Sequence, residues 1–272
     1  MPANAYVTLV TNHDYADAAI ALIRSLVLTG TSADIVVMHT GAVEAADLEP
    51  LKALGARCVE AGLLDTSAEF NARHQRDRLH ADAPFTKGNK PAFHTPLDNF
   101  AKLRLWELEE YDNIVFLDAD TIVIRNIDRL FGYPEFSAAP NVYESLADFH
   151  RLNSGVFAAK PSKQTFAAMM RRLDGPDARF WRRTDQTFLQ EFFPDWHGLP
   201  VFDNMLQYVW FNMPDLWEWT SVRVIHYQYE KPWQADHPKR DRLQPLIDLW
   251  QAYRTGEAIP DIDALPNPAA PA

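Results

Sequence analysis

Apolar runs alternate with helix-forming segments in the N-terminal part of the chain, and this alternation limits the fold more than any other feature. Short apolar runs predict strands at Ala5–Val10, Ile35–Met38 and Arg57–Glu60, and the segments between them, Ala16–Thr29 and Glu44–Leu54, have the residue spacing of helices. Strands and helices that alternate at this distance form βαβ units. The sequence therefore predicts an α/β fold in which helices flank a Rossmann-like, mixed but mostly parallel sheet.

The rest of the chain continues this pattern after one interruption. Its predicted helices are Asn99–Glu110, Ser162–Leu173, Asp185–Phe193 and Lys239–Arg254, and its predicted strands lie at Ile114–Leu117, near Ser137, at Ser154–Ala159 and at Val222–His226. The length of 272 residues suits one large α/β domain. We therefore expect a single domain over residues 1–258, followed by a Pro/Ala-rich tail over residues 259–272 that we expect to be disordered.

The interruption is a polar stretch from Thr66 to Pro96 that is rich in His, Arg and Asp and contains three prolines. It predicts a long loop or a small helical excursion, and the sequence leaves open whether this loop closes over a substrate. His74, His80 and His94 follow no metal-ligand spacing. We expect them to be solvated loop residues.

Charge and composition exclude several classes of function. The formal net charge of -11 argues against nonspecific nucleic-acid binding, and the single cysteine, Cys58, excludes an intrachain disulfide and a cysteine-based zinc cluster. The N-terminus lacks the features of a signal peptide, and no apolar stretch has the length of a transmembrane helix. A cytoplasmic protein is the default expectation. Basic and aromatic residues in the last predicted helix leave open a peripheral contact with the inner face of a membrane.

Two aspartates close the apolar run Ile114–Leu117, in the sequence Asp118-Ala119-Asp120. In extended backbone, side chains two residues apart point to the same side. Two carboxylates that lie together in this way favour a hard divalent cation such as Mg²⁺ or Mn²⁺, and a cation held there is suited to binding a diphosphate. A strand-to-turn junction in which the aspartates only cap the chain is the structural alternative.

Polar residues also follow the first strand, where open α/β sheets bind their ligands. Thr11 and Asn12 are suited to hydrogen bonds with a nucleotide base, and Tyr15 is suited to stacking on it. An N-cap and turn before the next helix explains these residues better when the segment is taken alone.

Two later segments carry further polar candidates. Asn153 and Ser154 enter an apolar strand and suit contacts with sugar hydroxyls, although a simple turn explains them equally well. Asp185 and Gln186 lie at a predicted helix N-terminus, where capping alone accounts for them. A reactive role for Asp185 therefore needs support from elsewhere in the chain.

A histidine and a lysine near the C-terminus complete the set of candidates. His226 ends a predicted apolar strand, and Lys231 follows after four intervening residues. This pair suits a metal ligand and a phosphate clamp, and imidazole is a better ligand for Mn²⁺ than for Mg²⁺. A lone histidine at a strand end is more often structural.

Taken in order, these segments resemble glycosyltransferase family 8, the retaining GT-A enzymes of the glycogenin and galactinol synthase type. The match extends from about Ala5 to Trp233 and runs through Leu-Val-Thr-Asn, Ala-Lys-Leu, Asp-Ala-Asp, Asn-Ser-Gly-Val-Phe, Asp-Gln, Leu-Pro and a His followed by Lys-Pro-Trp. The resemblance implies a GT-A type domain. It also implies transfer of a hexosyl unit from a UDP-sugar, of the UDP-glucose, UDP-galactose or UDP-GlcNAc type, with retention of configuration.

The resemblance also implies a role for each matched residue. Asp118, Asp120 and His226 bind Mn²⁺, or Mg²⁺ in its place, and the ion bridges the diphosphate. The implied uridine, phosphate and donor-sugar contacts come from Leu9, Thr11, Asn12, Tyr15, Lys102, Ala119, Asn153, Ser154 and Lys231. The implied catalytic residues are Asp185, Gln186 and Lys102. A carboxylate beside the anomeric carbon stabilises positive charge there, and the sequence leaves open whether the acceptor attacks from the front face or a covalent intermediate forms on Asp185.

Departures from the family pattern limit this assignment. The turn from His226 to Lys231 is short and lacks glycine, Asp203-Asn204 replaces a Tyr-Asn pair, and Thr184 replaces a small residue. No counterpart of the self-glucosylated tyrosine of glycogenin is present, so we do not expect a glycogen primer. The alternatives are a sugar nucleotidyltransferase, whose glycine-rich phosphate loop is missing, and an inactive nucleotide-sugar-binding protein, which the complete set of metal ligands argues against.

The acceptor is left open among carbohydrate, lipid-linked and small-molecule classes. Phe202–Trp219 is dense in aromatic residues, which suit either a sugar-stacking rim or core packing. We expect no nucleic-acid partner. A homodimer is one alternative for the oligomeric state.

Overall fold

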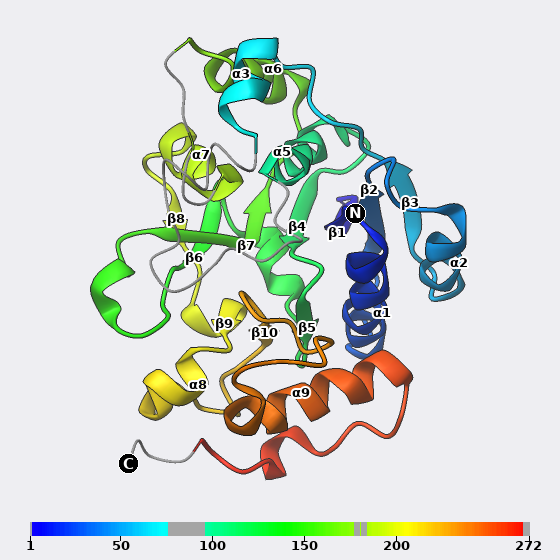
Figure 1. Cartoon of the computed structure of the whole chain (residues 1–272), viewed down its shortest axis with the longest axis vertical. Helices are drawn as coiled ribbons and strands as arrows, with labels where there is room; N and C mark the ends of the chain where they lie inside the picture. The colour runs from blue at the N-terminus through cyan, green and yellow to red at the C-terminus, as the bar shows by residue number, and fades with distance from the viewer. Residues whose placement is uncertain (1, 76–95, 177–179, 181–183, 269–272) are drawn as a thin grey trace.

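A mixed seven-stranded sheet forms the centre of the structure, a computed structural model that describes residues 2–75, 96–176, 180 and 184–268 (Figure 1). The strand order is β3-β2-β1-β4-β7-β6-β8. The strands are β1 (Asn4–Val10), β2 (Asp34–His39), β3 (Arg57–Glu60), β4 (Asn113–Leu117), β6 (Ser137–Pro140), β7 (Leu152–Ala159) and β8 (His197–Gly198). Only β7 runs antiparallel to its neighbours, β4 and β6; the other pairs are parallel. The predicted α/β fold with a mostly parallel sheet is confirmed.

A second, smaller sheet lies next to the end of β4. It contains β5 (Thr121–Val123), β10 (Val224–His226) and β9 (Met205–Leu206), with β10 antiparallel to β5 and parallel to β9. Residues 118–120 are the whole connection between β4 and β5. The Asp-Ala-Asp segment therefore lies where the chain leaves the large sheet and enters the small one.

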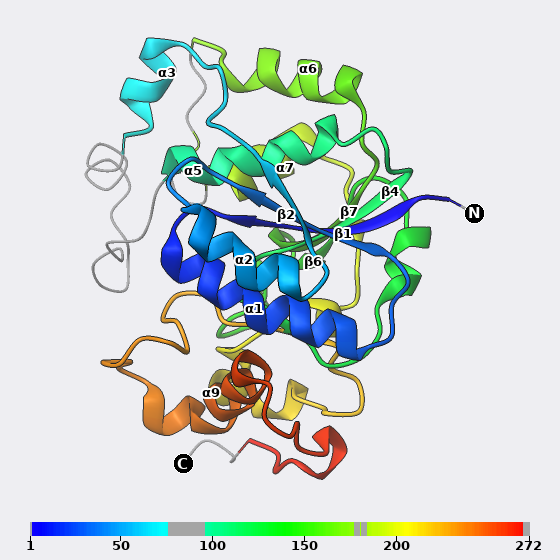
Figure 2. The ribbon, with the colours of Figure 1, turned by 90° about the vertical axis from the view of Figure 1, so that its right-hand side faces the viewer.

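Helices cover both faces of the large sheet (Figure 2). On one face lie α1 (His13–Leu28) and α2 (Ala45–Ala53), and on the other lie α5 (Pro96–Phe100), η1 (Ala101–Glu107), α6 (Lys163–Leu173) and α7 (Thr184–Phe192). The remaining helices are α3 (Ala68–Arg73), η2 (Asp128–Gly132), η3 (Leu146–Asp148), η4 (Val201–Asn204), α8 (Val209–Asn212), η5 (Pro214–Leu216), α9 (Arg240–Thr255) and η6 (Ile262–Ala264). Because the central strands are buried on both faces, they are apolar without alternation, as a covered parallel sheet requires.

Strand β1 shows how the two faces are packed. Ala5, Val7 and Leu9 belong to the hydrophobic cluster that includes η1 and α7, whereas Tyr6 and Val10 belong to clusters on the α1 side. Successive side chains of a strand point to opposite faces, so one continuous apolar run contributes to both layers. The carboxyl end of β1 is thereby fixed beside the end of β4, its parallel partner.

The aromatic segment Phe202–Trp219 contributes mainly to a second core. Trp210, Trp217 and Trp219 are buried, and their ring centroids lie 5.1–5.7 Å from one another. Leu246 and Trp250 of α9 belong to the same cluster. Of the two roles considered for this segment, core packing accounts for the three tryptophans.

The C-terminal segment is described up to residue 268. Ile259 and Leu265 pack against the second core, and the Trp219 indole donates a hydrogen bond to the carbonyl of Pro266 at 3.0 Å. In the structure, the apolar residues Ile259, Ile262 and Leu265 are partly buried against the second core, which holds residues 259–268 against the domain. The last four residues lie outside the described part.

The predicted helix Asn99–Glu110 is instead a short α5 followed by the 3₁₀ helix η1. Its central residues, among them Lys102, Leu103 and Trp106, are buried on several sides. A segment enclosed in this way has no single apolar face, so helical periodicity is a poor guide to its backbone geometry.

His74 is also placed differently from expectation. Its side chain is fully buried, its Nε2 accepts a hydrogen bond from the backbone N–H of Phe180 at 3.1 Å, and its Nδ1 lies 2.9 Å from the carbonyl of Phe70. It is a satisfied core histidine rather than a solvated one. His80 and His94 lie outside the described residues, as does most of the predicted loop up to Pro96. Within the part of the chain that the structure covers, no helix combines the length and apolar character needed to cross a bilayer.

A buried ion pair fixes η4, which precedes β9. Asp203 is fully buried, and Nη2 of Arg129 in η2 donates to both of its carboxylate oxygens at 2.6 Å. Burial raises the pKa of Asp203, and the Arg129 charge opposes this shift. Removing the arginine leaves a buried charge without compensation.

We predict that Arg129→Met lowers the free energy of unfolding at neutral pH by about 3 kcal/mol, near the lower end for broken buried pairs because the guanidinium is partly exposed. A carboxyl whose folded-state pKa is raised costs stability as pH rises through that pKa, so the loss should shrink as the pH is lowered. Urea unfolding at neutral and acidic pH measures this. The exposed Arg171→Met is the control, and an equal loss in both variants contradicts the prediction.

Candidate active site

The two aspartates of the Asp-Ala-Asp segment lie in a turn, not in extended backbone. The N–H of Asp118 donates to the carbonyl of Gly155 in β7 at 2.8 Å, and the N–H of Thr121 donates back to the carbonyl of Asp118 at 3.1 Å. Asp118 thus ends the large sheet and Asp120 precedes the small one. The expectation that strand alternation aligns the two carboxylates is wrong. The turn brings them together by reversing the chain around Ala119.

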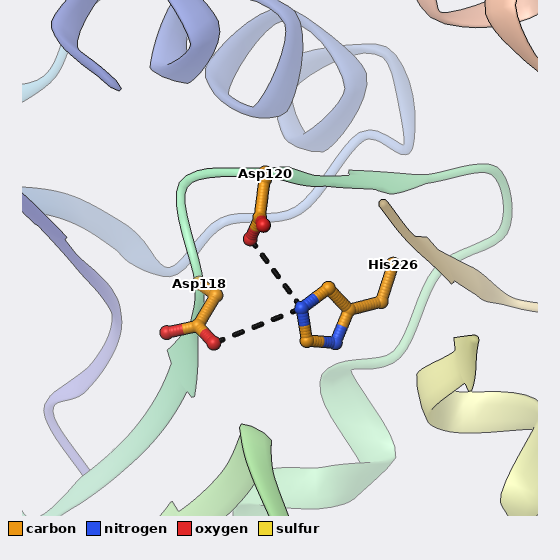
Figure 3. Close-up of side chains that lie close together, drawn as sticks. All are labelled: Asp118, Asp120 and His226. Atoms are coloured by element: carbon orange, nitrogen blue, oxygen red, sulfur yellow. Dashed lines mark ion pairs between the residues drawn. The ribbon is translucent and has the colours of Figure 1, made fainter. Parts of the chain in front are cut away.

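His226 completes a group of three side chains that could hold a metal ion (Figure 3). It lies in β10 opposite Thr121 of β5, so strand pairing carries its imidazole to the turn. The Nε2 atom is 3.4 Å from an oxygen of Asp120 and 3.8 Å from an oxygen of Asp118. Ligand atoms bound to one small divalent ion at about 2.1 Å are about 3.0 Å apart at a right angle, so these separations are close to those of a coordinating set.

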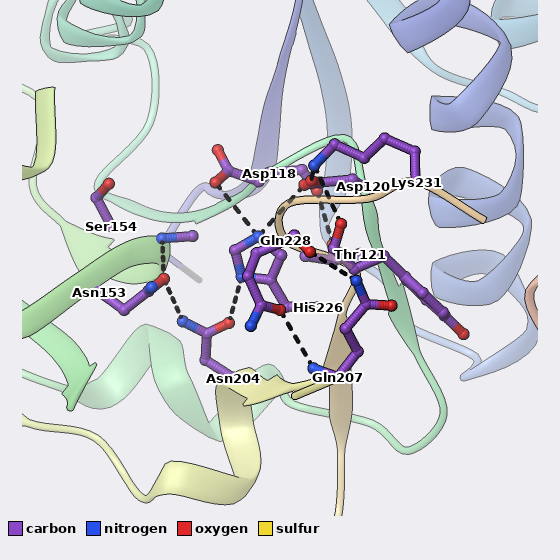
Figure 4. A network of polar contacts seen from close by, with 12 residues as sticks. Asp118, Asp120, Thr121, Asn153, Ser154, Asn204, Gln207, His226, Gln228 and Lys231 are labelled. Carbon is purple, nitrogen blue, oxygen red and sulfur yellow. Dashed lines mark hydrogen bonds and ion pairs between the residues drawn. The ribbon is translucent and has the colours of Figure 1, made fainter. Parts of the chain in front are cut away.

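Two buried lysines bind the other oxygens of the same aspartates. Lys102 Nζ is 2.9 Å from the second oxygen of Asp118, and Lys231 Nζ donates to the second oxygen of Asp120 (Figure 4). Each carboxylate therefore directs one oxygen toward a lysine and one toward His226. The lysines neutralise the buried charge without occupying the oxygens that face the imidazole.

Burial and neighbouring charges shift the pKa values of the two aspartates in opposite directions. Burial raises the pKa of Asp118, and the nearby charge of Asp120 adds to this, while Lys102 opposes it. Burial acts in the same sense on Asp120, but Lys231 and His226 outweigh it and hold the pKa of that carboxyl well below its usual value. Burial tends to lower the pKa of both lysines, but the carboxylates beside them raise it overall. Both lysines are therefore charged at neutral pH.

A second cluster lies around Asp185 at the start of α7. Its carboxylate accepts hydrogen bonds from Lys102 Nζ at 2.8 Å and from the Ser154 hydroxyl at 2.9 Å, and the Thr184 hydroxyl donates to its other oxygen at 3.0 Å. Gln186 accepts a hydrogen bond from the N–H of Ser154 at 3.3 Å. Lys102 is therefore shared between Asp118 and Asp185, so the predicted catalytic residues lie together with the candidate metal site.

Among the residues predicted to hold a uridine, Asn12 has a structural role, whereas Tyr15 lies beside a lysine of the candidate metal site. Asn12 caps α1 by accepting from the N–H of Tyr15, as the structural alternative requires. The Tyr15 ring lies 5.9 Å from Lys231 Nζ and 5.8 Å from the Trp233 ring, and Thr11 is buried beside Thr40. Tyr15 thus lies next to the lysine that binds Asp120. Burial raises the pKa of the Tyr15 hydroxyl to about 12.

Two of the predicted donor contacts are buried in hydrophobic clusters. Leu9 lies 9% exposed in the cluster with η1, and Ala119 is 3% exposed in the cluster with Val10 and Ala16. Their side chains help to fix the end of β1 and the Asp-Ala-Asp turn.

Asn153 has polar neighbours that sequence reasoning did not connect with it. Its side chain contacts Asn204 at 2.9 Å and Asn141 at 3.1 Å, and Asn204 in turn contacts His226 Nδ1 at 2.9 Å. Asn204 was visible in the sequence only as half of a departure from the family pattern, and Asn141 gave no signal. Strand pairing between β9 and β10, which are far apart in sequence, is what brings Asn204 to the histidine.

Gly155 lies directly beneath the imidazole. A Cβ atom placed on it would be 2.3 Å from His226 Cε1 and 2.4 Å from Nδ1. No side chain fits there while His226 keeps its position. The imidazole of His226 therefore explains why the third residue of the Asn-Ser-Gly segment in β7 is a glycine.

The donor set fits a divalent cation. Two carboxylate oxygens and one imidazole nitrogen converge from the turn and from β10, and the neighbouring ammonium groups bind other atoms of the same carboxylates. Oxygen and imidazole ligands together suit Mn²⁺, and Mg²⁺ less well because it prefers oxygen alone.

Comparisons with known proteins show which family the chain resembles. Residues 6–237 match glycosyl transferase family 8. The chain is 31% identical over 239 residues to UDP-glucuronate:xylan alpha-glucuronosyltransferase 2 of Arabidopsis thaliana, covering 84% of this chain but 35% of that protein. It is also 31% identical to human glycogenin-1, covering 94% of this chain and 73% of that protein. The chain thus spans about a third of the length of the plant relative.

Solved structures share the fold at low sequence identity. The glycosyltransferase GlyE of Streptococcus pneumoniae TIGR4 superimposes with a TM-score of 0.66 at 16% identity, covering 96% of this chain and 62% of that one. The galactosyltransferase LgtC, in complex with donor and acceptor sugar analogues, gives a TM-score of 0.61 at 14% identity, covering 94% and 98%. The expected GT-A type fold is confirmed.

We predict that Gly155→Ala weakens Mn²⁺ binding at least about tenfold, because the added methyl group displaces the imidazole from the aspartates. Isothermal titration of metal-free protein with Mn²⁺ measures this. Gly198→Ala in β8 is the control, since a Cβ there meets nothing within 4 Å. Wild-type affinity in Gly155→Ala contradicts the role of His226 as a ligand.

Proposed function

We propose that this chain, which belongs to glycosyl transferase family 8, is a metal-dependent glycosyltransferase that transfers a hexosyl unit from a UDP-sugar to an acceptor with retention of configuration. The observation that carries this proposal is the sharing of two carboxylates, Asp120 buried and Asp118 partly exposed, between two lysines and one imidazole. This concentration of ionisable groups lies at the end of a sheet, where α/β folds bind ligands.

The charge balance of the cluster suits a nucleotide diphosphate. Asp118, Asp120 and Asp185 carry three negative charges and Lys102 and Lys231 two positive ones, so these five side chains together have a net charge of about one negative unit. A divalent cation makes this net charge positive. The site then attracts an anion that carries more than one charge, as a diphosphate does.

The chain's own residues then divide the work of the reaction. A divalent ion bound by Asp118, Asp120 and His226 supplies electrostatic stabilisation to a departing diphosphate. Lys231 and Lys102 are the ammonium groups placed to bind phosphate oxygens as negative charge develops there. Tyr15, beside Lys231, is the candidate for the uracil-stacking residue.

Asp185 is the candidate for the residue beside the anomeric carbon. Its oxygens are already bound by Lys102, Ser154 and Thr184, which hold the carboxylate in one orientation. A fixed carboxylate stabilises the positive charge that develops on a sugar ring during transfer. Both the front-face and the double-displacement routes to retention are consistent with this placement. Gln186 orients the same segment through Ser154.

The relatives widen the choice of donor. The plant proteins are named for transfer from UDP-glucuronate to xylan, so UDP-glucuronate joins UDP-glucose, UDP-galactose and UDP-GlcNAc as a donor to be tested. The acceptor is a carbohydrate or a conjugate of one. A sugar nucleotidyltransferase is disfavoured by the family match, and an inactive binding protein is disfavoured because all three candidate ligands converge.

We predict that release of UDP from one of these four donors requires Mn²⁺ and that Asp120→Asn lowers the rate at least about a hundredfold, because the variant loses a metal ligand and the partner of Lys231. Slow hydrolysis in the absence of acceptor suffices for the assay. The exposed Asp241→Asn in α9 serves as the control. Full activity in excess chelator, or in the Asp120 variant, rules out the metal assignment.

We further predict that Asp185→Asn lowers kcat at least about a hundredfold and leaves the Mn²⁺ affinity within about threefold of wild type, because Asp185 binds Lys102 and Ser154 rather than His226. Steady-state UDP release and metal titration are measured on the same preparation. If the two quantities fall in parallel, Asp185 acts through the metal site and not at the sugar.

A further inference from the structure

We propose that a chain of three asparagine side chains, Asn141, Asn153 and Asn204, positions His226 and sets which ring nitrogen of the neutral imidazole faces the two aspartates. This inference rests on the proposed metal-dependent function of the site. The three amides come from the residue that follows β6, from β7 and from η4, and they lead to the imidazole of β10. Figure 4 shows Asn153, Asn204 and His226. All three asparagines are nearly or fully buried. We name them the amide chain.

The orientation of the amide chain is fixed by one backbone group. The N–H of Gly155 can only donate, and it points at Asn153 Oδ1 at 2.9 Å. The side-chain oxygen of Asn153 is thereby identified without reference to any other side chain. Asn204 Nδ2 donates to this same oxygen at 2.9 Å, and Asn153 Nδ2 donates to Asn141 Oδ1 at 3.1 Å. Reversal of either amide would place two donors or two acceptors against each other.

The tautomer of His226 follows from this orientation. Because the nitrogen of Asn204 is directed at Asn153, its oxygen lies 2.9 Å from His226 Nδ1. An amide oxygen only accepts, so Nδ1 must carry the proton. In the neutral ring the lone pair is then on Nε2, the atom that faces Asp118 and Asp120. Histidine ligands generally need such a partner on the second nitrogen to fix the ring and its tautomer.

Two further contacts hold the amide chain in place. The backbone beside Asn204 is fixed by the buried pair of Asp203 with Arg129, and Gly155 leaves room for the ring directly above β7. The amide chain also uses the polar atoms of Asn153 within the protein. We therefore assign Asn153 to positioning of the histidine in place of contact with the donor sugar.

The hydrogen bonds of the amide chain also explain why residue 204 is an amide and not a carboxylate. A carboxylate at this position still accepts from Nδ1, but it has no donor for Asn153 Oδ1, and two acceptors would face each other at the 2.9 Å contact. Asn204→Asp should therefore keep the acceptor for His226 Nδ1 but lose the donor to Asn153. Asn204→Leu should lose both hydrogen bonds. The two variants separate hydrogen bonding to the ring from its positioning.

The test is long-range ¹H–¹⁵N correlation NMR of metal-free, histidine-labelled protein at a pH of about 8, where free histidine is neutral. His226 is assigned by comparison with His226→Gln. We expect the wild type to show a protonated Nδ1, because this nitrogen faces the Asn204 oxygen. In Asn204→Leu we expect this signature to be lost and Mn²⁺ affinity to fall about 10- to 100-fold. In Asn204→Asp the signature should persist, with weaker Mn²⁺ binding than in wild type.

Asn113→Leu, which removes an asparagine contact at the far end of β4, is the matched control and should change neither readout. An unprotonated Nδ1 in the wild type overturns the proposal even where Asn204→Leu fails to fold, and so does a folded Asn204→Leu with wild-type Nδ1 protonation and affinity. Because the tautomer is read without metal, the two hypotheses fail separately. A protonated Nδ1 in a protein that binds no metal contradicts the proposed function and leaves the positioning of His226 intact.

Discussion

The placement of Asp118 and Asp120 at one point, the second buried and the first 30% exposed, is the constraint on which the rest of this structure depends. Two adjacent carboxylates that are largely removed from water repel each other and lose hydration, and this is tolerable only where cations or hydrogen-bond donors satisfy their oxygens. Here Lys102 and Lys231 bind one oxygen of each, and the remaining oxygens face His226. The lysines satisfy one oxygen of each carboxylate without a metal ion, and the oxygens that face His226 stay in position for one.

This constraint explains the division of the fold into two sheets. The aspartates lie between β4 of the large sheet and β5 of the small one, and the ligand that completes the set comes from β10, the partner of β5. A metal ion at this junction would be held by both sheets at once. The helices on the other face contribute Lys102, from η1, and Asp185, which shares this lysine, from the first turn of α7.

How far the sequence predicted this arrangement depended on the range of the interactions involved. The alternation of strands and helices predicted the large sheet, because burial on both faces leaves a local signal in each strand. The three candidate ligands were predicted from order and resemblance, but the reason given for the two aspartates was wrong, since a turn and not an extended strand aligns them. The 3₁₀ geometry of η1 and the buried role of His74 were missed for a related reason. Both depend on neighbours distant in sequence, which no local pattern records.

The amide chain is the clearest case of information that only the folded structure contains. Asparagine is common in turns, so Asn141, Asn153 and Asn204 each have a sufficient local explanation. Their meaning depends on the pairing of β9 with β10 and on one backbone N–H, that of Gly155, whose direction orients every amide in turn. A single unambiguous donor can thus determine the protonation of a histidine two side chains away. Gly155 leaves space for the imidazole, and its N–H also sets the direction of the hydrogen bonds in the amide chain. Substitution at residue 155 therefore disturbs the candidate metal site both sterically and through hydrogen bonding.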